Sequence, residues 1–195
     1  GDIGCFSLYA TKNMISGEGG IVTTNNDEYA ELVRRFRHHG QSEQTRYEYH
    51  DLGYNYRMTD LHAAIALGQL EKIEEYTNTR IENAKMLTDG LKEVKGIAVP
   101  VVNINVKHVF HQYTIRVDGY KLTRDELKEE LHQKGIGSAV FYPKPLHLHP
   151  HFSRMGYKEG DFPVSENASK KVLSLPVHPS VTKEEIKKII DAIKC

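Results

Sequence analysis

Lys12 is a residue whose type and position could do covalent chemistry. It follows an apolar, strand-like segment and stands just before the glycine cluster Gly17-Glu18-Gly19-Gly20. A lysine held at a strand end can point its amine into a cavity, and burial of such an amine favours the neutral form that a Schiff base needs. Ser7 adds a hydroxyl, and the glycines let backbone N–H groups approach an anion closely. On spacing alone, an exposed lysine without a chemical role is the more common explanation of this pattern.

Histidines form a second candidate group, because His147, His149 and His151 alternate along one segment. Alternate imidazoles on an extended chain can converge on a metal such as zinc. However, no acidic residue or cysteine is interleaved with them, and Pro145 and Pro150 stiffen the segment. We therefore expect no metal site here, and a metal-binding module is the weakest of the functional hypotheses.

The composition excludes several classes of function. Lys plus Arg number 26 and Asp plus Glu also number 26, so the formal net charge is zero. Nucleic-acid binding rests on accumulated positive charge, and this balance argues against it. The apolar runs are far too short to cross a bilayer, so we expect no membrane partner. Cys5 and Cys195 are the two cysteines, which favours a reducing, cytoplasmic location over a disulfide framework.

The first part of the chain is predicted to contain two strands and a helix. The strands lie within residues 1–9 and at residues 21–24, where β-branched residues gather. The run Asn25-Asn26-Asp27 can cap a helix whose apolar residues follow helical spacing as far as Gly40. Residues 41–58 are polar, aromatic and irregular, which is typical of a long loop.

Apolar residues then recur at helical steps from Thr59 to Gly96, which predicts one long helix that links two parts of the molecule. If unbroken, this helix exceeds roughly 30 residues, and Asn78 and Gly90 are the positions where we expect it to bend. The domain boundary is predicted at its end, between residues 95 and 96.

The remainder is predicted to form a compact α+β unit. Capping boxes begin two helices, one at Thr123 and one at Thr182. A short helix is expected near residues 164–171. Strands are expected at residues 109–117, 136–142 and 172–175, with a loop rich in proline and histidine after the second of them.

Several segments together resemble one protein family. Phe6-Ser7-Leu8-Tyr9-Ala10-Thr11-Lys12-Asn13-Met14, followed by Gly17-Glu18-Gly19-Gly20-Ile21-Val22, closely resembles the cofactor-lysine segment of the DegT/DnrJ/EryC1/StrS sugar aminotransferases. Further matches follow in the family's order: Arg37-His38-His39-Gly40, Gly53-Tyr54-Asn55-Tyr56-Arg57-Met58, residues 61–70, Phe141-Tyr142-Pro143, Pro145-Leu146-His147 and Leu173-Ser174-Leu175-Pro176. The resemblance covers nearly the whole chain.

The resemblance implies an α/β fold of the aspartate aminotransferase type. Residues 1–95, including the long helix, would be part of the large domain of a fold type I transferase that depends on pyridoxal phosphate (PLP). Residues 96–195 would form the small α+β C-terminal domain. The match begins about halfway through a full-length member, so we expect this chain to be a piece of a longer enzyme. The other half would supply the aspartate that pairs with the ring nitrogen of the cofactor.

The resemblance also implies roles for individual residues. Lys12 would form the Schiff base with PLP and shuttle the proton of transamination, and Ser7 would hydrogen-bond the cofactor phosphate. Asn55 would reach the cofactor phosphate of the neighbouring subunit, because family members build each active site at a homodimer interface. Weaker substrate contacts are expected from three residues: Arg57, Tyr142 and His147. The family's dehydratases carry histidine in place of this lysine, so Lys12 favours an aminotransferase.

The implied reaction is the transfer of an amino group to the keto carbon of a nucleotide-linked sugar, with glutamate as the amino donor. Such a reaction belongs to amino-sugar or cell-surface polysaccharide biosynthesis. We expect these 195 residues alone to be inactive, since the ring-nitrogen aspartate is not among the matched motifs. A rival hypothesis from another class is an inert interaction or regulatory domain derived from such an enzyme.

Overall fold

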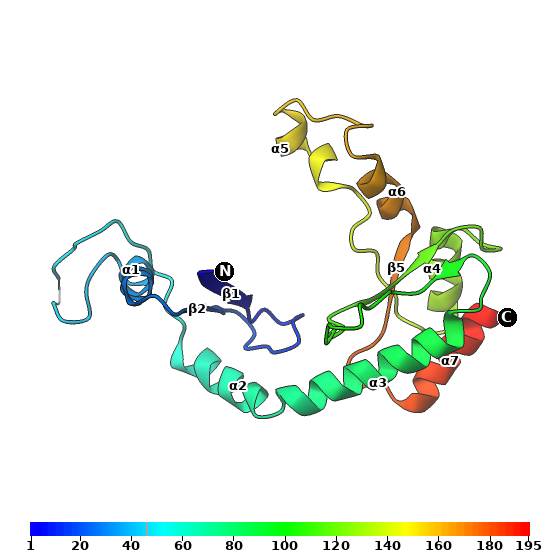
Figure 1. Ribbon diagram of the computed structural model, residues 1–195, viewed down its shortest axis with the longest axis horizontal. Coiled ribbons are helices and arrows are strands. Elements are labelled where there is room, and N and C mark those ends of the chain that lie inside the picture. Colours follow the sequence, from blue (N-terminus) through cyan, green and yellow to red (C-terminus); the bar gives the residue numbers. More distant parts are fainter. Residues whose placement is uncertain (46) are drawn as a thin grey trace. The chain divides into compact units, whose positions relative to one another are not determined.

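The computed structural model of the chain describes residues 1–45 and 47–195 (Figure 1). Its contacts divide it into two compact units, Gly1–Glu74 and Glu75–Cys195. Across the described residues, no helix combines the length and the apolar character that a membrane span requires.

The first unit begins with the two predicted strands, which pair with each other. Strand β1 (Ile3–Ser7) lies antiparallel to β2 (Gly20–Thr24), in a register that joins Ile3 to Thr24 and Ser7 to Gly20. Helix α1 (Asp27–Arg37) follows, and its N-cap is Asn26, whose side chain accepts the Tyr29 N–H at 3.1 Å. The prediction of two strands and a capped helix is confirmed.

The predicted helix from Thr59 to Gly96 is wrong as a single element. The structure has two helices there, α2 (Asp60–Leu70) and α3 (Ile73–Leu91), and the chain leaves the helical path at residues 71–72. At that point the Lys72 N–H bonds the Gln69 carbonyl at 3.1 Å, which is the tighter bonding of a turn. Asn78 and Gly90, where a bend was expected, both lie inside α3. Gly68 weakens the last turn of α2, whereas the apolar spacing continues across the break and conceals it.

The second unit is built on a three-stranded antiparallel sheet with the order β3-β4-β5. The strands are β3 (Ile97–Ala98), β4 (Tyr113–Val117) and β5 (Val172–Leu175). Its helices are α3, α4 (Arg124–Gln133), α5 (Pro150–Ser153), α6 (Pro163–Lys171) and α7 (Lys183–Lys194), with a 3₁₀ turn η1 (Leu146–Leu148). Both predicted capping boxes, at Thr123 and Thr182, are present in full.

Two predicted strands of this unit differ from the structure. The segment 136–142 forms only an isolated bridge between Ala139 and Ser174, because Gly137 and Pro143 on either side disfavour a longer ladder. The strand expected at 109–117 begins only at Tyr113. Phe110 has a φ of 43°, which is a turn conformation and not an extended one.

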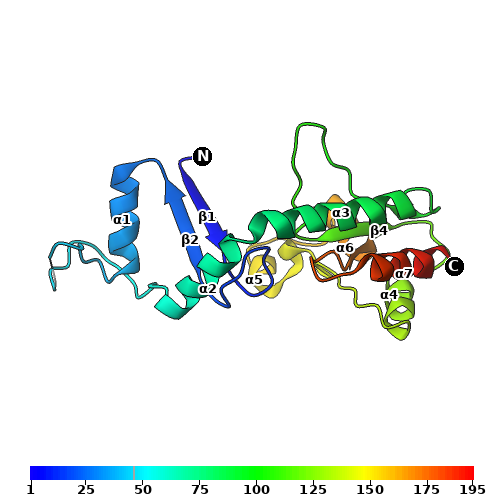
Figure 2. The ribbon, with the colours of Figure 1, turned by 90° about the horizontal axis from the view of Figure 1, so that it is seen from below.

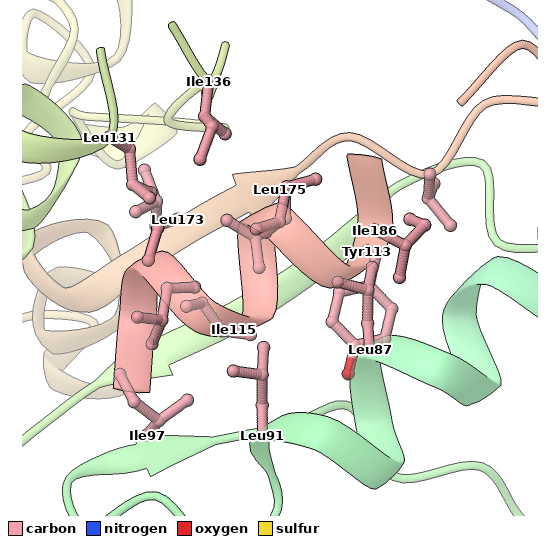
Figure 3. Packing of buried hydrophobic residues seen from close by; sticks show 14 of the residues in the cluster. Leu87, Leu91, Ile97, Tyr113, Ile115, Leu131, Ile136, Leu173, Leu175 and Ile186 are labelled. Atoms are coloured by element: carbon pink, nitrogen blue, oxygen red, sulfur yellow. The ribbon is translucent and has the colours of Figure 1, made fainter. Parts of the chain in front are cut away.

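The core of the second unit explains why it begins within α3 and not between residues 95 and 96. Leu87 and Leu91 of α3 are fully buried against the sheet and α7 (Figure 3). Helices α3 and α7 run side by side in both views (Figures 1 and 2), and a Cβ on Gly90 would lie 2.6 Å from Ile190. Helix α3 is therefore an integral layer of this unit and not a free linker.

One polar group of this core shows how burial is compensated. The Tyr113 ring is fully buried, and its hydroxyl lies 2.8 Å from the Thr88 hydroxyl on α3. Burial raises the pKa of Tyr113 to about 12, although the bond from Thr88 opposes the shift. The buried hydroxyl is thus hydrogen-bonded and uncharged, as a stable core requires.

Replacing Leu87 with alanine tests the assignment of α3 to this core. Leu87→Ala should lower the free energy of unfolding by about 3 kcal/mol, because it leaves a cavity at a fully buried site. Leu146→Ala, at a side chain that is 68% exposed, is the matched control and should change it by less than about 0.5 kcal/mol. Equilibrium urea unfolding gives both values. Equal midpoints for the two variants would contradict the packing of α3.

Candidate functional site

Lys12 lies on a loop that backbone hydrogen bonds close tightly. Three bonds of 2.8 to 3.1 Å tie its two sides together: Leu8 N–H to Gly19 O, Ala10 N–H to Gly17 O, and Ser16 N–H to Leu8 O. At the tip, the Lys12 N–H bonds the Tyr9 carbonyl at 2.9 Å. Leu8 and Ser16 are buried, and the Lys12 side chain is half-buried. The loop therefore holds the backbone of Lys12 in one place.

The glycines of this loop are needed for its shape. Gly17 and Gly19 have φ values of 89° and 128°, a conformation that residues with side chains rarely adopt. A Cβ on Gly19 would lie 2.7 Å from the Met58 side chain, and one on Gly17 would lie 3.7 Å from His62. The backbone conformation therefore calls for glycine at both positions, and at Gly19 a side chain would also press against Met58, just before α2.

Ser7 is brought onto the same loop as Lys12. It is the last residue of β1, and its Oγ accepts the Tyr9 N–H at 3.3 Å. The Ser7 side chain is exposed. Since the oxygen is engaged as an acceptor, its O–H is left to donate to a ligand. An amine and a hydroxyl donor therefore stand on one closed loop at a strand end.

Asn55 lies on a segment that runs along the end of α1. Three backbone bonds hold this segment: Tyr54 N–H to Phe36 O at 2.7 Å, His39 N–H to Tyr54 O at 2.9 Å, and Tyr56 N–H to Arg37 O at 3.0 Å. Tyr54 and Tyr56 stack with ring centroids 5.0 Å apart, and both contact Phe36. Because side chains alternate along an extended chain, Asn55 and Arg57 lie on the opposite face, and both are exposed.

A close backbone approach makes this arrangement possible. A Cβ on Gly40 would lie 1.7 Å from the Asp51 carbonyl oxygen, and one on Gly53 would lie 2.0 Å from the Gly40 nitrogen. The sequence identified Gly40 only as a helix end. Its second role, to admit the returning chain at Asp51, depends on a partner eleven residues away that spacing does not reveal.

Arg57 is joined to two residues that the sequence analysis did not select. Its Nη1 lies 2.9 Å from His38 Nδ1 and 2.8 Å from His39 Nε2. The adjacency of the two histidines was visible in the sequence, but their common partner was not. An open hollow of about 630 Å³ lies beside them, and its lining residues are Arg37, His38, His39, Gln41, Ser42, Glu43, Tyr47 and Arg57.

Tyr142 and His147 belong to the second unit and differ in their surroundings. Tyr142 is 72% exposed and available to a ligand. His147 is only 8% exposed, and its Nε2 lies 2.9 Å from Glu166 Oε1. This bond gives His147 a structural partner, and the substrate contacts expected of Tyr142 and His147 stay predictions. In the described ranges, no three histidine, cysteine or acidic side chains gather as a metal site would need.

Glu166 organises the loop around His147. Its carboxylate also accepts the Gly160 N–H at 2.9 Å and the Phe162 N–H at 3.3 Å. Burial acts to raise the pKa of Glu166, but the bonds from Gly160, His147 and Phe162 outweigh it, and the pKa of this carboxyl is lowered. The buried carboxylate therefore stays ionised and holds both ends of the segment from His147 to Phe162.

Comparison with known proteins gives a consistent result. The model of the DegT/DnrJ/EryC1/StrS aminotransferase family matches residues 1–194. The chain is 39% identical to a pleiotropic regulatory protein of Geobacillus stearothermophilus, over 99% of this chain and 51% of that protein. It is 35% identical to UDP-N-acetyl-3-dehydro-alpha-D-glucosamine 3-aminotransferase of Acidithiobacillus ferrooxidans, over 100% of this chain and 50% of that enzyme. The chain thus spans about half the length of these relatives.

Solved structures agree with this match. DesV of Streptomyces venezuelae, in complex with a ketimine intermediate, superposes with a TM-score of 0.92 at 32% identity, over 98% of this chain and 50% of that one. A Streptococcus pneumoniae protein described as a sugar aminotransferase, in its PLP form, gives a TM-score of 0.89 at 26% identity, over 99% and 51%. The α/β fold expected from the resemblance is thereby confirmed.

Replacing Glu166 with glutamine tests its role in the loop. Glu166→Gln should speed amide hydrogen exchange at Gly160 and Phe162 by about tenfold, because a neutral amide is a weaker acceptor than a carboxylate. Glu159→Gln, at an exposed neighbouring carboxyl, is the matched control and should leave both amides unchanged.

The same loop should respond to acid. A carboxyl whose pKa is lowered by folding stabilises the fold above its ordinary value of 4.5, and this stabilisation is lost as the pH falls through the lowered value. Protection of the two amides in the wild type should therefore be constant from pH 7 to about 5.5 and fall below about pH 4. Protection that is equal in wild type and Glu166→Gln at neutral pH would show that Glu166 does not hold the loop.

Proposed function

We propose that this chain, which belongs to the DegT/DnrJ/EryC1/StrS aminotransferase family, carries the catalytic lysine of a PLP-dependent enzyme that aminates a nucleotide-linked keto sugar. The observation that carries the proposal is the closed loop that holds Lys12 beside Ser7 at the end of β1. The name of the Acidithiobacillus relative, a UDP-sugar aminotransferase, supports the substrate class. Glutamate is the proposed amino donor, and amino-sugar or cell-surface polysaccharide biosynthesis is the proposed setting.

The residues present fit this cofactor. A primary amine, that of Lys12, is the group that can hold an aldehyde covalently, and the free O–H of Ser7 can donate to a phosphate oxygen. Gly17 and Gly19 have no side chain that would shield the backbone of the loop, so an anion can approach the backbone there. When bound, PLP supplies an electron sink for the substrate carbon that loses its proton.

Lys12 has two tasks in this scheme. Its Nζ would hold the cofactor in the resting enzyme, and during the reaction the same nitrogen would hold and move the proton at the substrate carbon. Both tasks need the amine to return to the same place. The backbone bonds from Leu8 to Gly19 supply that constraint, because they fix the path of the chain on both sides of Lys12.

Asn55 and Arg57 are proposed to act at a neighbouring subunit of a homodimer. They share the exposed face of the segment that lies along α1, opposite the stacked tyrosines. The Asn55 amide can donate to the cofactor phosphate of that subunit, and the Arg57 guanidinium can bind an anionic group of the substrate in two-pronged fashion. Tyr142 is the proposed sugar contact from the second unit.

An inert interaction or regulatory domain is the rival hypothesis. One relative is named as a regulatory protein, but others are named for aminotransferase activity on nucleotide sugars. The chain retains the lysine loop in full, which a purely structural descendant would not need. The enzyme is therefore the better supported of the two.

Chemical trapping tests the role of Lys12. In the complete protein as encoded, borohydride treatment after incubation with PLP should fix the cofactor mass on the peptide that contains Lys12. Lys12→Ala should abolish that adduct and lower transamination by about 10³-fold or more, because the proton-transfer group is lost. Lys85→Ala, at an exposed lysine of α3, should retain both. An adduct that maps to Lys85 or to another lysine refutes the assignment.

Subunit mixing tests the shared site. Lys12→Ala and Asn55→Ala homodimers should each be inactive or nearly so. Heterodimers of the two variants should regain roughly half of the wild-type activity, because one of their two sites keeps both residues. The readout is amino-group transfer to the keto sugar by isolated heterodimers. Failure to regain activity in verified heterodimers would exclude a site built from both subunits.

A further inference from the structure

Two neighbouring histidines contact one nitrogen of Arg57. Nη1 lies 2.9 Å from His38 Nδ1 and 2.8 Å from His39 Nε2. A guanidinium has no acceptor, so both imidazole nitrogens must accept from it. Both rings are therefore neutral in this arrangement, with the remaining proton on Nε2 of His38 and on Nδ1 of His39.

This pattern leaves the binding edge of Arg57 open. A guanidinium carries five N–H donors, and the two on Nη1 are used by the histidines. The three on Nε and Nη2 remain, and these lie side by side as the fork that matches two oxygens of a phosphate or carboxylate. The histidines thus occupy one edge of the guanidinium and turn the other edge outward.

Arg57 also has no carboxylate paired with it among the residues that the structure describes. Its neighbours on α1 are paired with carboxylates: Arg37 with Glu43 at 3.4 Å, and Arg35 with Glu31 at 3.0 Å and Asp51 at 3.3 Å. Within residues 1–45 and 47–195, the recorded partners of the Arg57 guanidinium are the two neutral imidazoles. An arginine whose direction is fixed by neutral acceptors keeps its full charge for a ligand.

The backbone at His39 supports a functional reading. His39 has a φ of 58°, which is uncommon for a residue with a side chain, and Gly40 follows at 78°. The bond from His39 N–H to Tyr54 O and the close approach of Gly40 to Gly53 hold this conformation. Such strained residues persist where the surrounding structure maintains them, often at binding sites. Here the strain brings the second imidazole to Arg57.

We propose that His38 and His39 are positioning residues that aim the Arg57 guanidinium at the diphosphate of the nucleotide-linked substrate. This inference rests on the proposed function and adds to it a group that selects for the anion. The open hollow of about 630 Å³ beside the three residues gives the ligand access. The shared chemistry is the diphosphate, and the base of the nucleotide has no part in this contact.

The test compares side chains that keep or remove the two acceptors. In His38→Asn/His39→Gln the amide oxygens replace Nδ1 and Nε2 as acceptors, whereas in His38→Leu/His39→Leu both are lost. UDP, dTDP and GDP are each titrated against the complete PLP-loaded protein by calorimetry. His50→Leu is the matched control, because His50 contacts Thr45 and Glu48 in the same unit.

The expected results separate positioning from general stability. Arg57→Ala should raise the Kd of each bound nucleotide diphosphate by about tenfold. The double variant His38→Leu/His39→Leu, the leucine pair, should raise the same Kd by about fivefold. The Asn/Gln pair and His50→Leu should stay within about twofold of wild type. In the Arg57→Ala background the leucine pair should add less than about twofold, because its effect passes through Arg57.

Three results would overturn the inference. The Asn/Gln pair could bind as weakly as the leucine pair, the leucine pair could keep its full effect without Arg57, or none of the three diphosphates could bind the wild type. Thermal unfolding of each variant identifies losses of affinity that come from misfolding. If the leucine pair misfolds, the affinity of the Asn/Gln pair still tests whether the two acceptors position Arg57. The borohydride adduct on Lys12 is measured in parallel, so that a failure of the proposed function is seen separately.

Discussion

The backbone bonds that close residues 8–19 are the constraint on which the candidate site depends. A lysine has four rotatable bonds in its side chain, so the position of its amine is defined only if the backbone beneath it is fixed. Here the fixing is done by main-chain hydrogen bonds and by glycines at positive φ. In the role proposed for Lys12, the amine can therefore move while its point of attachment stays still. The backbone of the loop supplies the rigidity, and the Lys12 amine is the group that the proposed function requires.

Local signals in the sequence predicted the elements well wherever one residue decides the outcome. Asn26, Thr123 and Thr182 each begin a helix in the structure, because a side-chain oxygen that caps a helix acts within three residues. The errors lie where the outcome depends on distant partners. The break after Leu70 keeps the apolar spacing of a single helix, and the segment 136–142 lacks a neighbour along most of its length. Periodicity reports which face is apolar and not what will cover it.

The site residues show the same division. Lys12, Ser7 and Asn55 were found through matching motifs, and their roles stay predictions that the proposed experiments address. His38 and His39 were part of a matched motif too, yet nothing in their spacing points to Arg57, which lies nineteen and eighteen residues away from them, respectively. His147 is expected from the resemblance to contact substrate, and the structure adds a partner that the sequence does not reveal, Glu166. In both cases the partner of the histidine is visible only in the three-dimensional structure.

The described residues between Phe36 and Arg57 make several contacts with one another. Phe36 meets Tyr54 and Tyr56, Arg35 next to it pairs with Asp51, and Gly40 meets Gly53. A segment whose residues hold one another in place can be exchanged in evolution as one block. Exchange of this block between relatives would transfer Asn55 and Arg57 with their geometry intact, whereas an insertion inside the block would displace both residues together. The residues proposed to bind the substrate would in this way change together, separately from the loop that holds Lys12.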